Sequence, residues 1–291
     1  MELSRIIRYI RTVAGLSQEK FADEIGVTKL TVTRWESGTS IPNNIAQAGI
    51  YNVAKKHNVQ FFDLIISDLP EHLVENDKAV LYHASVSGII GPIEPKSRIE
   101  CDFGKGFYMG TQPSQPLTMI FSPDRNDTEN AVMYTLEFDL NGLNVFYVPP
   151  IIDWALLVAY SRGRMEQYTG TPLYEKCGKL LNGYDVAVGK IADDKIFTAL
   201  DLFFDSIISD NNVLDCLTLL PLGEQYVALN EKACRRIRML EERKFSELER
   251  LCIRDVSKQN RDRAMGTAKE ILKNRRRDGG RYFDEIMEGR G

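Results

Sequence analysis

The stretch LSQEKFADEIGVTKLTVTRWESGTSIP, residues 16–42, decides the fold of the N-terminal part of the chain. Ser17 and Thr28 are good N-cap residues, and Gly26 lies between the two helices that they would begin. A further helix is predicted over residues 3–14, where apolar side chains recur at helical spacing. Three short helices joined by glycine turns are typical of a helix-turn-helix unit.

The same stretch resembles the phage-repressor (Cro/C1) helix-turn-helix family. The resemblance implies an all-α DNA-binding domain over residues 1–66, whose third helix enters the major groove. It implies DNA contacts by Gln18, Thr28, Lys29, Thr31 and Thr33. Because a single half-site binds weakly, we expect a homodimer. The alternative is a protein-interaction bundle that does not bind DNA.

The length and composition predict more than one domain. The chain has 291 residues, of which 43% are hydrophobic, enough for a sizeable core. Residues 1–66 carry 8 basic and 6 acidic side chains, residues 231–291 carry 18 and 12, and the middle carries 11 and 23. Since nucleic-acid affinity depends on neutralising phosphates, we expect DNA contacts at the ends of the chain and not in its acidic middle.

Cysteine usage and hydropathy narrow the class of protein further. The 5 cysteines are odd in number and include no Cys-x-x-Cys pair, which argues against a disulfide framework and a zinc site. We expect no metal. Neither a signal peptide nor a run of about 18 apolar residues is recognisable, so we expect a cytoplasmic protein that does not enter membranes.

The rest of the chain predicts an α+β domain over residues 80–238. Residues 67–79, with Pro70 and several charges, are predicted to form a linker. Strands are predicted at 80–83, 131–139, 145–148, 184–188 and 226–229, and helices at 151–162 and 195–208. These elements show no regular βαβ alternation, which favours an α+β domain over a doubly wound one.

Residues 239–291 are predicted to form a helical, basic C-terminal extension. Apolar residues at helical spacing over 231–256 predict a helix, and three arginines follow at 275–277. We favour a docking helix with a solvated basic end over a nucleic-acid or coiled-coil contact.

Common nucleotide-binding and hydrolase signatures are missing from the middle domain. Gly104-Lys105-Gly106 lacks the third glycine and the strand-to-helix context of a dinucleotide fingerprint. His83 is the only histidine in this domain, which excludes a multi-histidine metal site. No Gly-x-Ser-x-Gly elbow accompanies it.

Three dispersed strings carry the functional signal: Leu81-Tyr82-His83-Ala84-Ser85, Phe103-Gly104-Lys105-Gly106-Phe107-Tyr108 and Glu224-Gln225-Tyr226-Val227-Ala228-Leu229. In order and strand context they resemble the NAD-binding elements of diphtheria-toxin-like and poly(ADP-ribose) polymerase domains. The chain from about Val80 to Arg238 is also similar to a bacterial family of domains of unknown function in the ADP-ribosyltransferase superfamily. That similarity includes Tyr184-Asp185-Val186, Ala192-Asp193-Asp194 and Glu231-Lys232-Ala233.

The resemblance implies an ADP-ribosyltransferase-like fold that uses NAD as its substrate. It implies catalytic roles for Gln225, His83 and Tyr108, and NAD contacts by His83, Ala84, Gly104, Gly106, Phe107 and Tyr108. Phe121 is a candidate for the second aromatic wall. The family's usual glutamate is replaced by Gln225, which is neutral and cannot act as a general base, so chain elongation is not expected.

These features predict an NAD-dependent mono-ADP-ribosyltransferase or NAD glycohydrolase fused to a DNA-binding domain. This activity would fit a toxin or phage-defence effector. Such an effector would have an antitoxin partner and a macromolecular acceptor for ADP-ribose. The alternative is a transcription regulator whose second domain senses NAD or another nucleotide without catalysis. Each of these residues also has a structural alternative: His83 is a structural histidine, the Gly-Lys-Gly string is a tight turn, and Asp193-Asp194 is a helix cap. The role of Asp185 stays open.

Overall fold

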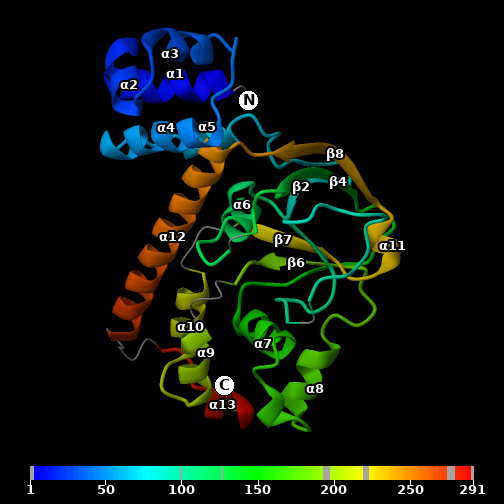
Figure 1. The fold of residues 1–291 in the computed structure, drawn as a ribbon. Helices are drawn as coiled ribbons and strands as arrows, with labels where there is room; N and C mark the ends of the chain where they lie inside the picture. Colours follow the sequence, from blue (N-terminus) through cyan, green and yellow to red (C-terminus); the bar gives the residue numbers. More distant parts are fainter. Residues whose placement is uncertain are drawn as a thin grey trace.

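The computed structural model describes residues 3–98, 100–125, 127–192, 197–218, 223–273 and 279–289. A helical N-terminal unit lies beside a mixed α+β unit built on one sheet, and the long helix α12 (Glu247–Lys273) runs along both (Figure 1). The predicted α+β class with a helical N-terminal domain is therefore confirmed. Within the described ranges, no helix is both long and apolar enough to cross a membrane.

The N-terminal helices begin and end where their caps predict. Ser17 Oγ accepts a hydrogen bond from the Lys20 N–H at 3.2 Å, and Thr28 Oγ1 accepts one from the Thr31 N–H at 3.2 Å. Gly26 ends the second helix in the left-handed conformation, with φ of 80°. The helices are α1 (Leu3–Val13), α2 (Gln18–Ile25), α3 (Lys29–Glu36), α4 (Asn44–Lys56) and α5 (Phe62–Ile66).

One sheet organises the second unit, with the strand order β5-β6-β7-β3-β2-β4-β8 and β1 paired to β2. The strands are β1 (Val74–Glu75), β2 (Lys78–Ser85), β3 (Phe107–Gly110), β4 (Val132–Asp139), β5 (Val145–Tyr147), β6 (Val186–Lys190), β7 (Glu224–Ala228) and β8 (Ile237–Lys244). Neighbours are antiparallel except for the parallel pair β5 and β6. The predicted strands in the middle domain all overlap strands of this sheet.

Helices cover the sheet, and alternate residues of each strand enter different cores. Leu81, Phe107 and Tyr226 pack on one face, together with α11. Tyr108 and Val227 pack on the other face against α7 to α10, beside a core formed with α6 and α12. The remaining helices are α6 (Ser114–Ile120), α7 (Ile152–Ser161), η1 (Glu166–Tyr168), α8 (Pro172–Lys179), α9 (Phe197–Phe204), α10 (Asp210–Leu217), α11 (Glu231–Cys234) and α13 (Phe283–Met287).

The segment predicted as a linker, residues 67–79, is part of the fold. Leu69 is 7% exposed and belongs to a core that contains residues of both units. Strand pairing begins at Val74, and β2 begins at Lys78. The charged side chains of this segment suggested a linker, but the backbone hydrogen bonds of the sheet and the burial of Leu69 hold it in place.

The C-terminal region differs from the prediction of one helix over 231–256. β8 pairs with β4 over Ile237–Lys244, and Leu240 is the extra residue at a bulge between Met239 and Glu241. The open edge of β4 supplies a hydrogen-bonding partner, which outweighs the helical spacing of the apolar residues in β8. After it, α12 packs against α4, α5, α6 and α10 as the predicted docking helix, whereas Arg275 to Arg277 lie outside the described residues.

Candidate functional site

The three dispersed strings lie on adjacent strands of the sheet. β3 pairs with β2 on one side and with β7 on the other. Tyr82 is opposite Gly110, and Gly110 is in turn opposite Gln225. Chain segments more than 100 residues apart in the sequence therefore meet at the centre of the sheet, as the resemblance implied.

The side chains of the predicted catalytic residues do not share one face. Because partners in antiparallel strands point the same way, Gln225 and Tyr108 lie on the face of Tyr82 and Gly110, and His83 lies on the other. His83 stacks on Phe107 with ring centroids 4.5 Å apart, and its Nδ1 lies 2.7 Å from the Tyr108 carbonyl oxygen. Burial lowers the pKa of His83, so the ring is neutral and Nδ1 donates to that carbonyl. The structure thus separates His83 from Gln225.

The glycine string forms a tight loop that is closed by hydrogen bonds of its own. Tyr108 Oη donates to the Gly104 carbonyl at 2.7 Å and accepts from the Phe103 N–H at 3.0 Å. The Gly106 N–H donates to Ser97 Oγ at 3.0 Å, and its carbonyl accepts from the Ser97 N–H at 3.0 Å. A Cβ at Gly106 would overlap Val227 of β7. A ligand amide could bind the Gly106 backbone only by displacing Ser97.

Phe121, the candidate for a second aromatic wall, lies elsewhere. Its side chain is fully buried in the core shared with the N-terminal unit and packs edge-on against Phe245, with centroids 5.6 Å apart. Ala84 packs against the same core. The assignment of Phe121 to the NAD pocket is therefore wrong, because this aromatic side chain fills the space between the sheet and α12.

A buried polar network links Gln225 to the loop before the glycine string. Asp102 is 3% exposed, and its Oδ1 accepts from Arg162 Nε at 3.0 Å. Its Oδ2 accepts from Gln225 Nε2 at 2.7 Å and from the Ala192 N–H at 3.0 Å. Sequence reasoning missed Asp102 and Arg162. The one available signal was that Asp102 directly precedes the Phe-Gly-Lys-Gly string.

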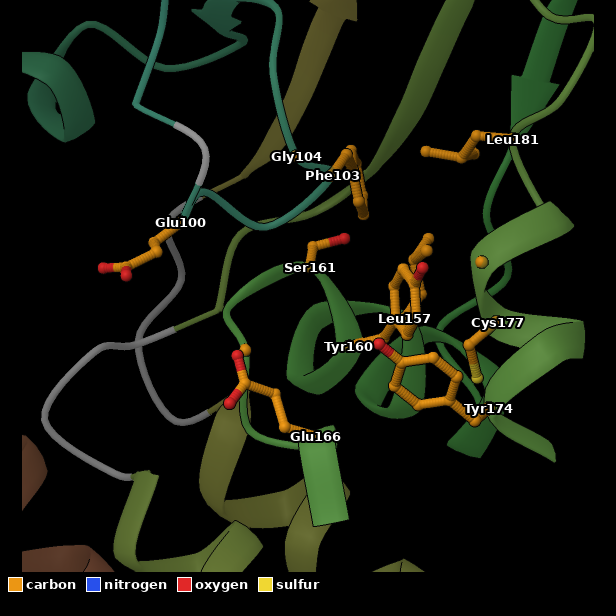
Figure 2. Close-up of a pocket in the computed structure, with 12 residues that line it drawn as sticks. Glu100, Phe103, Gly104, Leu157, Tyr160, Ser161, Glu166, Tyr174, Cys177 and Leu181 are labelled. Atoms are coloured by element: carbon orange, nitrogen blue, oxygen red, sulfur yellow. The ribbon is translucent and has the colours of Figure 1, made fainter. Parts of the chain in front are cut away.

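A cleft of about 430 Å³ opens beside this loop, between it and helices α7 and α8 (Figure 2). Its walls combine aromatic and aliphatic side chains with polar groups, and Glu100 and Glu166 are exposed carboxylates on its lining. The lining residues are Glu100, Phe103, Gly104, Leu157, Tyr160, Ser161, Gly163, Glu166, Tyr174, Cys177, Gly178 and Leu181. Asp102 and Arg162 are chain neighbours of lining residues, so the polar network lies next to the cleft.

Two tyrosines dominate one wall of the cleft. The rings of Tyr160 and Tyr174 meet edge to face, with centroids 4.8 Å apart. Gly178 allows this packing, since a Cβ there would lie 2.6 Å from Tyr160 Oη. Burial and the neighbouring Tyr174 raise the pKa of Tyr160, and burial raises the pKa of Cys177 to about 11. The aromatic wall can pack against a flat ring. Both groups are neutral at pH 7, so the cleft does not offer a reactive thiolate.

Asp185 has a structural role that explains two further strings. Its Oδ2 accepts from Lys232 Nζ at 2.6 Å and from the Asn144 N–H at 2.9 Å, and its Oδ1 accepts from Asn230 Nδ2 at 3.0 Å. The hydrogen bond from Lys232, followed by that from Asn144, lowers the pKa of Asp185 to about 2. Tyr184-Asp185-Val186 and Glu231-Lys232-Ala233 therefore meet in one ion-paired connection at the start of β6. Asp193 and Asp194 lie outside the described residues.

The predicted DNA-contacting residues occupy the exposed end of α2 and the surface of α3. Gln18 Nε2 donates to Glu36 Oε2 at 2.8 Å, and Gln18 Oε1 accepts from Thr33 Oγ1 at 3.1 Å. Burial opposes ionisation of Glu36, but hydrogen bonds from Arg11 and Gln18 hold its pKa below the ordinary value. Lys29 is exposed. Thr28 and Thr31 are joined through their hydroxyl groups, 2.8 Å apart. Arg34, also exposed on α3, was not predicted.

The described residues contain no group of His, Cys, Asp or Glu side chains arranged to hold a metal ion. The residues that could hold an organic cofactor are those that line the cleft.

Comparison with known proteins agrees with a helical N-terminal unit followed by an α+β unit. No curated protein and no solved structure matches it. Residues 7–45 match a family model described as helix-turn-helix, so a helix-turn-helix DNA-binding domain is present. Residues 79–239, more than half of the chain, match a model described as protein of unknown function (DUF3990). The chain therefore belongs to the DUF3990 family and carries a helix-turn-helix domain at its N-terminus.

Proposed function

We propose that the DUF3990 domain binds NAD in the cleft beside the 100–104 loop and catalyses mono-ADP-ribosyl transfer or NAD hydrolysis. One observation carries the proposal: Gly104 of the second string lines the cleft, and Gln225 of the third is hydrogen-bonded to Asp102 in the same loop. The second of the three strings thus contributes to the cavity wall, and the third is joined to the same loop by a hydrogen bond.

The cleft suits the ring that NAD must present for this reaction. The nicotinamide ring of NAD is flat and positively charged, and Tyr160, Tyr174 and Phe103 provide aromatic walls. Glu100 and Glu166 would add negative charge near it. Cleavage of the glycosidic bond passes through an oxocarbenium-like state, which a fixed ribose and polar groups nearby would favour.

Gln225 limits the reaction to a single transfer of ADP-ribose or to hydrolysis of NAD. A neutral amide hydrogen-bonds a ribose hydroxyl but cannot remove a proton from an acceptor. We therefore do not propose repeated addition of ADP-ribose. We propose transfer of one ADP-ribose group to an acceptor or to water.

A second candidate function is favoured by the hydrogen bonds inside the site. Gln225 Nε2 and Tyr108 Oη are both engaged with the protein, and His83 lies on the opposite face of the sheet. A site whose Gln225 amide and Tyr108 hydroxyl already bond within the protein would suit a non-catalytic sensor of NAD or another nucleotide in a DNA-binding regulator.

Labelled NAD distinguishes the two candidates. The full chain is incubated with NAD, and both free nicotinamide and label on added protein, RNA or DNA are measured. Nicotinamide release that is lost in Gln225→Ala supports the enzyme. Asp153→Asn is the control, because this exposed carboxylate of α7 pairs with Lys176 outside the cleft lining. Binding without release supports the sensor, and no binding at all contradicts both.

The N-terminal domain would hold this activity on DNA. We propose a homodimer that binds two half-sites, and an effector role as a toxin or phage-defence factor restrained by an antitoxin. Sedimentation of the chain with and without a duplex that carries two half-sites tests the dimer. One copy bound per duplex would contradict it.

A further inference from the structure

The side-chain amide of Gln225 has one allowed orientation. Its Nε2 has two hydrogens, and both are used: one is donated to Asp102 Oδ2 at 2.7 Å and one to the Lys190 carbonyl at 3.0 Å. A flipped amide would point its oxygen at a carboxylate and a carbonyl, which are both acceptors. The partners of Nε2 therefore determine where Oε1 points.

Asp102 and the Lys190 carbonyl, which accept from this amide, are themselves fixed by further hydrogen bonds. Arg162 donates to Asp102 Oδ1 from Nε at 3.0 Å and from a terminal nitrogen at 2.5 Å. Trp154 Nε1 donates to the Lys190 carbonyl at 3.1 Å. Asp102 forms an ion pair with Arg162, so the hydrogen bond from Gln225 is charge-assisted and stronger than a neutral one.

Gln225 Oε1 is left as an acceptor without a donor. Gln225 is 5% exposed, and none of the described hydrogen bonds ends on its Oε1. Among fully buried side-chain nitrogens and oxygens of the described residues, Arg254 Nε alone lacks a partner, so Oε1 is not fully enclosed by the protein. A polar oxygen that is this buried and is turned away from its own network is poised to accept from a ligand.

We infer that Asp102 is a positioning residue, which acts through Gln225 to present Oε1 to a ribose hydroxyl of the bound dinucleotide. This inference rests on the proposed function. Asp102 itself is sealed by Arg162, Gln225 and the Ala192 N–H, so it neither contacts the ligand nor takes its proton. It sets the direction of the one hydrogen bond that distinguishes a ribose from a deoxyribose at this point.

The test compares the affinities for NAD and for its analogue without the 2′-hydroxyl of the nicotinamide ribose. Calorimetry on the full chain gives both dissociation constants. Wild type is expected to prefer NAD by about tenfold, the value of one hydrogen bond in a buried site. Gln225→Met, which is similar in shape but cannot accept, removes the preference. Asp102→Asn is expected to reduce it to about threefold or less, because the amide is no longer held by a charge.

Asp185→Asn is the matched control. It removes another buried, ion-paired carboxylate at the sheet, but its partners are Lys232, Asn144 and Asn230. A merely structural loss would weaken binding of both ligands equally, so the full tenfold preference must persist in this variant. The same preference in Asp102→Asn would overturn the inference.

Two further measurements test the inference if Asp102→Asn does not fold or if the protein does not bind NAD. If Asp102→Asn does not fold, Arg162→Lys, which keeps the charge but loses the paired contact, must lower the preference. If wild type binds no NAD, the proposed function fails. In that case the Gln225 side-chain amide hydrogens, followed by NMR, report on positioning alone. They are expected to exchange slowly in wild type and faster in Asp102→Asn, and equal rates would overturn the role of Asp102.

Discussion

Acid titration of Asp185 gives a quantitative test of the connection between β6 and α11. Asp185 is 7% exposed, and the hydrogen bonds from Lys232, Asn144 and Asn230 lower its pKa from 3.8 to about 2. A carboxyl whose pKa is lower in the folded state stabilises the fold above its unfolded pKa and loses this effect as the pH falls towards the folded pKa. The stabilisation is therefore complete above about pH 5 and disappears between about pH 4 and pH 2.

The size of the effect follows from the shift. A lowering of almost two pKa units corresponds to about 2.4 kcal/mol at neutral pH, of which about 1 kcal/mol is already lost at pH 3. In Asp185→Asn the free energy of unfolding should be lower at pH 6, and its decline between pH 6 and pH 3 should be smaller than in wild type by about 1 kcal/mol. The Lys232→Met variant should also flatten this decline, because the carboxyl then loses the strongest of the interactions that lower its pKa.

Urea unfolding at a series of pH values measures this difference directly. Asp153→Asn serves as the control, because the Asp153 and Lys176 side chains are 36% and 57% exposed and an exposed ion pair contributes little. Parallel pH profiles of wild type and Asp185→Asn would refute the assignment of Asp185 as an ion-paired anchor.

Three further variants test other parts of the structure. Gly106→Ala places a Cβ against Val227 and should lower the free energy of unfolding by about 1–3 kcal/mol, with partial recovery on adding Val227→Ala; no loss in urea unfolding would contradict the close approach. Gln47→Leu removes the acceptor for the buried Leu248 N–H and should cost about 1–3 kcal/mol in the same assay, whereas an unchanged midpoint would argue against a shared core. Lys29→Ala should weaken binding to all DNA sequences and reduce the slope of log affinity against log salt by about 1, and an unchanged slope would remove Lys29 from the interface.

Local signals allowed much of the secondary structure to be predicted. The caps at Ser17 and Thr28 and the turn at Gly26 act within a few residues, so they could be identified without the rest of the chain. Strand alternation likewise located β4. The edge strand β8 was misread because its apolar spacing suits a helix, and only the unpaired edge of β4 favours a strand.

The site could be predicted only in part. The strings were correctly expected to meet, since β2, β3 and β7 are neighbours, but the face on which each side chain lies depends on register. A shift of one residue would exchange the faces of His83 and its neighbours. Asp102 and Arg162 are 60 residues apart and match no motif, so their pairing with Gln225 became visible only in the folded chain.

By itself, the sequence determined the helix-turn-helix unit and the α+β class of the second domain, because these depend on residue type and local spacing. The tertiary structure alone decided that His83 and Gln225 lie on opposite faces, that Phe121 belongs to the core, and that both units share a core along α12. Packing and strand register join residues that are distant in the chain, and these contacts leave no local pattern in a single sequence.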